Sequence, residues 1–220
     1  MHYDSLRIGR DRRKTARTAP VMNPYTGSVA GTVPMASLED VRAAIAVARA
    51  YKPTLTRFER SQVCLRTAAL LRERTEMISN LITAESGLSK KDSIYEVGRA
   101  CDVFTFAGNA ALIDDGQIFS CDLTPHGKKR RVYTMREPLL GVISAITPFN
   151  HPLNQVAHKV APSIATNNRM VLMNIKAENS SAEVAATDVG VIFNRQRAES
   201  QVLVADGEAA GGAVAGGDCA

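Results

Sequence analysis

The residues of this chain that could do chemistry gather in one short loop, Thr147-Pro-Phe-Asn-His-Pro152. Its two prolines fix φ and restrict the residue before each of them, so the backbone between them follows one path. The side-chain amide of Asn150, held in such a loop, can donate a hydrogen bond to negative charge that develops on a substrate oxygen. The alternative is a rigid turn in which the asparagine only serves the backbone.

The cysteines form no pattern that indicates a metal or disulfide site. The chain has four of them, Cys64, Cys101, Cys121 and Cys219. No two make a Cys-x-x-Cys pair and no histidine clusters with them, so neither zinc nor any other metal is expected. Such cysteine usage suits a reducing cytoplasm. Cys64 and Cys101 fall within helical patterns, which predicts small buried hydrophobes rather than nucleophiles.

Composition and charge exclude several classes of protein. A chain of 220 residues with 45% hydrophobic and 22% charged residues is ordinary for one or two globular domains. No apolar window of about 18 residues predicts a membrane span, and the basic N-terminus lacks the apolar region of a secretory signal. The net charge of +5 comes with two basic patches, Arg7–Arg17 and Lys128–Arg131, but no nucleic-acid-binding module. These patches are interpreted as solvated charge or as an attraction for anionic substrates.

The elements around the loop predict a parallel sheet. The apolar run from Leu139 to Ile146 predicts a strand that is buried on both faces. Residues 154–166 repeat apolar side chains at helical spacing, and Arg169–Met173 is a second apolar run. Strand, loop, helix and strand form a βαβ unit, and the carboxyl ends of such strands are where nucleotide cofactors usually bind.

Upstream, residues 1–19 show no periodicity and are predicted to be a disordered basic lead-in. Asn-Pro and Gly then indicate a turn, and Val21-Met22 and the run Val29–Val33 on its two sides are predicted to pair as a hairpin. From Gln117 to Pro138 the pattern becomes β-like again, with two strands around a Pro-His-Gly turn.

Three amphipathic helices are predicted between these β-like segments. Ser37 is the expected N-cap of the first helix, and Pro53 ends it. Thr56 opens a longer helix with a capping box, and this helix runs to a stop at Gly87. Ser89 caps the third.

The loop Ile146-Thr-Pro-Phe-Asn-His-Pro152 resembles the signature loop of the aldehyde dehydrogenase superfamily. The segment Ala161-Pro-Ser-Ile-Ala-Thr-Asn-Asn-Arg-Met-Val-Leu172 resembles the helix-to-strand passage of that family. The resemblance implies an α/β fold, of which this chain forms the N-terminal part: helices plus an incomplete Rossmann-like parallel sheet with arm strands. Its implied divisions are a helical part of the cofactor domain at 20–116, arm strands at 117–138, an incomplete βαβ portion at 139–204 and an Ala/Gly-rich tail at 205–220.

The resemblance also implies roles for individual residues. Asn150 becomes the donor to the oxyanion of the covalent intermediate, and the intact family forms homo-oligomers in which arm strands pair between subunits. The groove for NAD or NADP is lined by Ile146, Thr147, Pro148 and Phe149. Arg99 and His151 are expected to hold the anionic end of a small aldehyde, as in the branch of the family that oxidises phosphonoacetaldehyde to phosphonoacetate. The alternatives are an exposed helix charge for Arg99 and a packing role for His151.

The resemblance weakens after Leu172. Met173 stands where the family has the lysine that holds the adenosine ribose, which puts cofactor binding in doubt. Residues 173–220 are either a diverged continuation or unrelated appended sequence, and the abrupt loss of pattern favours the second. No residue matches the family's catalytic Cys or general-base Glu, so we expect the chain to be inactive alone. The alternatives are a non-catalytic fragment that pairs with an intact subunit, or an anion-binding module.

Overall fold

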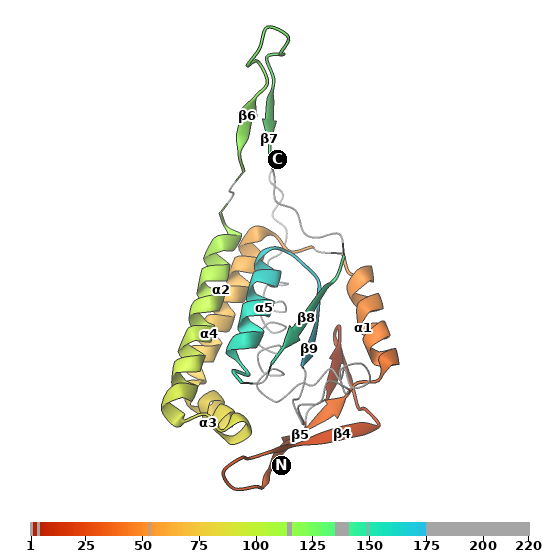
Figure 1. The fold of residues 1–220 in the computed structure, drawn as a ribbon, viewed down its shortest axis with the longest axis vertical. Helices are drawn as coiled ribbons and strands as arrows, with labels where there is room; N and C mark the ends of the chain where they lie inside the picture. The colour runs from red at the N-terminus through yellow and green to blue at the C-terminus, as the bar shows by residue number, and fades with distance from the viewer. Residues whose placement is uncertain are drawn as a thin grey trace, which may run out of the picture.

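The computed structural model describes residues 2–3, 5–52, 54–113, 116–134, 141–148 and 150–174. These residues form an α/β structure, as expected (Figure 1). The N-terminal strands are β1 (His2–Tyr3), β2 (Leu6–Ile8), β3 (Asp11–Arg13), β4 (Arg17–Met22) and β5 (Val29–Met35). The helices that follow are α1 (Leu38–Ala50), α2 (Arg57–Glu73), α3 (Thr75–Ser86) and α4 (Lys90–Ala111). The remaining elements are β6 (Ile118–Ser120), β7 (Arg131–Tyr133), β8 (Ile143–Thr147), α5 (Asn154–Ala165) and β9 (Met170–Asn174).

The prediction that residues 1–19 are disordered is wrong for the described part of that segment. β2 pairs antiparallel with β3, and β4 already begins at Arg17, where it pairs with β5 in the predicted hairpin. Leu6 and Ile8 are buried and pack against Val41 and Ala44 of α1. A strand of three residues alternates only once, so its two buried positions leave no periodic signal in the sequence.

The helices begin at the predicted caps. The side chains of Ser37 and Thr56 each accept from a backbone N–H three residues on, and the acidic side chain there reaches back to the cap, which completes both capping boxes. Ser89 caps α4 in the same way, through the backbone N–H of Asp92. Gly87 ends α3 in the left-handed conformation, with φ of 77°.

The single long helix predicted between Thr56 and Gly87 is wrong, because it is two helices, α2 and α3. The chain leaves helical geometry at Arg74, where φ is −103° and ψ is 16°. The hydroxyl of Thr75 donates to the backbone carbonyls of Leu71 and Arg72, which gives these groups a partner at the end of α2. Apolar spacing on both sides of Arg74 is consistent with one face, so periodicity alone did not reveal the break.

The main core lies where α2, α4 and α5 pack side by side (Figure 1). Its buried side chains include Leu71, Ile82, Val97, Phe104 and Leu153. Gly108 lets α4 approach α2, since a Cβ there would lie 3.1 Å from Leu65 Cγ. None of the described helices is long and apolar enough to cross a bilayer.

β8 and β9 are parallel neighbours, in register from Ile143 beside Met170 to Thr147 beside Asn174. α5 covers one face of this pair, where Ala145, Val156 and Leu172 are buried together. The prediction that the strand is buried on both faces is wrong, because the side chain of Ile146 is 51% exposed. Among the described residues β9 is the only strand that pairs with β8. The predicted pair of strands after Gln117 is confirmed, and this β6–β7 hairpin extends away from the body (Figure 1).

Candidate active site

The Asn150 loop joins the carboxyl end of β8 to the N-terminus of α5, as the sequence predicts. Asn150 is exposed and forms no hydrogen bond with any described residue. Its amide is therefore available to a ligand at the edge of the sheet where parallel strands end. Phe149 lies outside the described residues.

A buried carboxylate from α4 anchors the far side of this loop. Glu96 is 2% exposed, and its Oε1 accepts hydrogen bonds from the backbone N–H groups of Leu153 (2.8 Å) and Asn154 (2.9 Å). These N–H groups stand at the start of α5, where no carbonyl of the helix itself can reach them. Glu96 also offsets the positive end of the helix dipole.

The sequence does not indicate this role of Glu96. It lies 57 residues from Leu153, so no local pattern links the two. One signal is present in the sequence: Glu96 directly precedes Val97, which repeats at helical spacing with the apolar residues Cys101 and Phe104. A charged residue at such a position is rarely buried without partners.

Of the other two candidate residues, His151 lies near Glu96 and Arg99 shares its helix. The Nδ1 atom of His151 is 3.5 Å from Glu96 Oε2, and the imidazole is 42% exposed. Arg99 follows Glu96 by three residues on α4, is exposed, and has its guanidinium 6.0 Å from the ring centroid of Tyr95. The structure thus brings His151 to the helix that carries Arg99, with Glu96 as the link.

The residues that were predicted to line the cofactor groove differ in the exposure of their side chains. Thr147 is fully buried, so its side chain cannot line a groove, whereas Ile146 and Pro148 are exposed. Nucleotide phosphates often bind the free N–H groups at a helix N-terminus. In α5 two of these groups already bind Glu96, so this helix cannot use them to hold a pyrophosphate.

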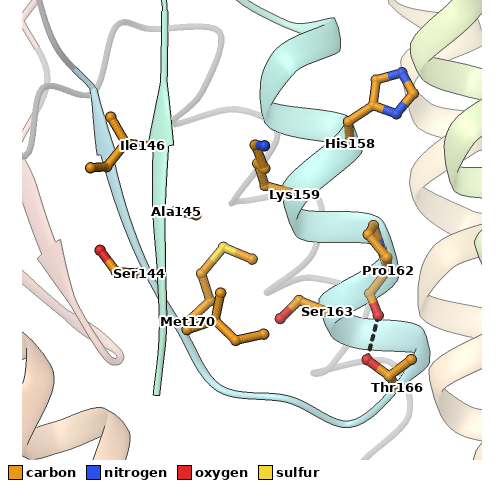
Figure 2. A pocket seen from close by; sticks show the side chains of 10 residues that line it. Ser144, Ala145, Ile146, His158, Lys159, Pro162, Ser163, Thr166 and Met170 are labelled. Carbon is orange, nitrogen blue, oxygen red and sulfur yellow. Dashed lines mark hydrogen bonds between the residues drawn. The ribbon is translucent and has the colours of Figure 1, made fainter. Parts of the chain in front are cut away.

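A hollow of about 290 Å³ lies between β8 and α5, but not beside Asn150 (Figure 2). Residues of α5 from His158 onward form one wall, and Thr166, which follows the helix, continues it. Met170, the first residue of β9, lines it as well. The hollow therefore extends toward the amino ends of β8 and β9, whereas ligands of parallel sheets bind at the carboxyl ends of the strands. Of the predicted site residues only Ile146 reaches it, and we do not assign it to the cofactor.

The described cysteines offer no nucleophile to this site. Cys64 and Cys101 are buried in the core, as predicted. Burial raises the pKa of the Cys64 thiol to about 12 and also raises the pKa of Cys101. Among the described residues, no three His, Cys, Asp or Glu side chains gather as metal ligands do.

Alkylation of the native chain tests this difference between the cysteines. At about pH 8, a thiol with a pKa near 12 holds more than about a thousandfold less thiolate than an ordinary cysteine. Iodoacetamide is therefore expected to modify Cys121, which is partly exposed, and to leave Cys64 and Cys101 unmodified when the peptides are read by mass spectrometry. Denatured protein, in which all cysteines react, is the control. Native labelling of Cys64 at the rate of Cys121 would contradict the structure.

Comparison with known proteins identifies the family. The model of the aldehyde dehydrogenase family matches residues 11–216. A 3-sulfolactaldehyde dehydrogenase of Priestia aryabhattai is 34% identical over 168 residues, which are 76% of this chain and 35% of that protein. The chain thus spans about a third of the length of this relative.

Solved structures agree with the sequence comparison. The NADP-dependent glyceraldehyde-3-phosphate dehydrogenase of Bacillus halodurans, complexed with NADP, is 27% identical with a TM-score of 0.71, over 97% of this chain and 42% of its own. Aldehyde dehydrogenase 21 of Physcomitrella patens, in complex with its product succinate, is 31% identical with a TM-score of 0.72, over 78% of this chain and 36% of its own.

The family match also corrects one expectation. Residues 173–220 were expected to be unrelated appended sequence, but the match continues to residue 216, which favours a diverged continuation. It likewise begins at residue 11, upstream of residue 20, where the implied cofactor domain starts. From its sequence, its fold and these matches, the chain belongs to the aldehyde dehydrogenase family.

Proposed function

We propose that this chain is the part of an NAD(P)-dependent aldehyde dehydrogenase that supplies the oxyanion donor, Asn150. The observation that carries the proposal is an exposed amide, without a described hydrogen-bond partner, in a loop that Glu96 anchors at its far end. A donor that is held in place before the reaction stabilises the oxyanion without reorganising.

Aldehyde oxidation needs a thiolate that attacks the carbonyl, an acceptor for the hydride, and water activated by a base. NAD or NADP supplies the hydride acceptor when it is bound. The exposed side chains of Ile146 and Pro148 are suited to one wall of its groove, and Thr147 can contribute only backbone. Phe149 stays a prediction for this groove. With Met173 in place of the family's lysine, the cofactor has one polar contact fewer.

The substrate is proposed to be a small aldehyde with an anionic end. The relatives named above support this class, since their names include a sulfonate, a phosphate ester and a dicarboxylate product. Within it we propose the oxidation of phosphonoacetaldehyde to phosphonoacetate. Arg99 offers a planar set of donors that matches a phosphonate, and His151 offers a ring nitrogen beside the oxyanion donor.

Kinetics of an intact relative that carries these residues tests the substrate class. Arg99→Ala and His151→Ala are each expected to raise KM for phosphonoacetaldehyde roughly 10- to 100-fold, because a charge-assisted hydrogen bond is lost. KM for a neutral aldehyde such as propionaldehyde should change little. The matched control is Lys91→Ala, which removes an exposed positive charge from the same helix. Equal effects on both aldehydes, or an equal effect of Lys91→Ala, would refute the assignment.

The hairpin favours a second role, pairing with another subunit. β6 and β7 expose four large apolar side chains, Ile118, Phe119, Val132 and Tyr133. Because two strands alone are only marginally stable in water, a partner that covers these side chains would stabilise the hairpin. We propose that these strands are the arm through which the chain joins a homo-oligomer, or through which a non-catalytic copy pairs with an intact subunit. A location in a reducing cytoplasm stays a prediction from cysteine usage.

A further inference from the structure

Glu96 does more than cap a helix. Its Oε1 binds both backbone N–H groups of α5, yet its Oε2 is buried and has no hydrogen-bond partner among the described residues. A buried carboxylate oxygen without a partner is costly, so a donor is expected to face it. Among the described residues, His151 Nδ1 lies 3.5 Å from Oε2 and is the donor that can face it.

The contact has a consequence for the histidine ring. A neutral imidazole carries its proton on one nitrogen only, and the partner of one nitrogen decides what the other can do. An approach of about 0.5 Å turns the contact into a hydrogen bond in which Nδ1–H donates to Glu96 Oε2. The neutral ring then presents Nε2, without a proton, on its exposed side.

We propose that Glu96 is a positioning residue that sets the tautomer and orientation of His151 while it holds the start of α5. One carboxylate thereby fixes both ends of the stretch that follows Asn150: the His151 ring through Oε2, and the Leu153 and Asn154 amides through Oε1. The inference rests on the proposed function only for the doubly protonated ring, in which Nδ1–H still donates to Glu96 and Nε2–H can donate to the anionic end of the substrate.

Glutamine at position 96 separates this role from simple capping. Its amide oxygen can still accept from the two α5 N–H groups, but its NH2 group is a donor and cannot accept from Nδ1–H. Glu96→Gln should therefore keep the fold and reverse the tautomer of His151. Glu96→Ala removes both interactions and should lower the melting temperature more than Glu96→Gln does.

The readout is a long-range ¹H–¹⁵N spectrum of the histidine rings of the labelled chain at about pH 9, above the ordinary histidine pKa of about 6.5. The chain has four histidines, and loss of one set of signals in His151→Gln assigns His151. We expect a protonated Nδ1 in the unaltered chain and a protonated Nε2 in Glu96→Gln. His158, which is exposed on α5, is an internal control, and Asp102→Asn removes an exposed carboxylate from α4 as the matched variant.

A protonated Nε2 on His151 of the unaltered chain would overturn the proposal, whatever the variants do. An Nδ1–H that persists in folded Glu96→Gln would overturn it as well, as would an equal change in Asp102→Asn. Addition of phosphonoacetate at about pH 6, below the ordinary histidine pKa of about 6.5, tests the proposed function separately, because a protonated ring carries an Nε2–H that can donate to this anion. If the His151 signals do not move with this anion, the substrate assignment fails while the tautomer result stands.

Discussion

Phe104→Ala is expected to lower the free energy of unfolding by about 3–5 kcal/mol. Phe104 is 1% exposed and is the largest fully buried side chain among the described residues. It belongs to the cluster that joins α2, α3, α4 and α5, so the cavity left by its ring would lie where four helices meet. A domain is typically stable by only roughly 5–15 kcal/mol, so a large part of the total would be lost.

The same helix supplies the control for Phe104. Phe106 is also a phenylalanine on α4, but it is 72% exposed. Phe106→Ala is expected to change stability by no more than about 0.5 kcal/mol. Urea unfolding followed by circular dichroism measures both variants. Similar losses from Phe104→Ala and Phe106→Ala would show that the helices do not pack around Phe104.

The features that the sequence predicted correctly are those specified by neighbouring residues. Ser37 and Thr56 predict the starts of helices because an acidic residue follows each of them three positions later, as in a capping box. The start of α5 is different, since no side chain caps it locally. Its cap is Glu96 from another helix, and a contact across 57 residues has no sequence pattern.

The two faces of β8 show that tertiary packing decides which side chains of an apolar run are buried. Leu139 to Ile146 contains too few polar residues to reveal an alternation, so the run was interpreted as buried on both sides. In the structure Ala145 and Thr147 are buried, while Ile146 is exposed. Strand geometry required neighbours to alternate, but only the position of α5 shows which residues point inward. Thr147, to which the resemblance assigned a place in the cofactor groove, is one of the residues that point inward.

Asn150→Ala is expected to leave the stability of this chain unchanged within about 0.5 kcal/mol, because the side chain is exposed and binds no described residue. In an intact relative that carries the same loop, the same substitution should lower kcat about 10²–10³-fold, which is the cost of one lost oxyanion donor. KM should change little, since the oxyanion exists only in the transition state and intermediate.

Asn150→Asp sharpens the test, because it preserves the size of the side chain and replaces the donor with an acceptor. If Asn150 faces the developing negative charge, Asn150→Asp should lower kcat at least as much as Asn150→Ala does, through both the lost donor and the added repulsion. An asparagine that only serves the turn would give the opposite order, because aspartate also suits turn backbone. A kcat within about threefold of the unaltered enzyme in both variants would leave Asn150 without a role in catalysis.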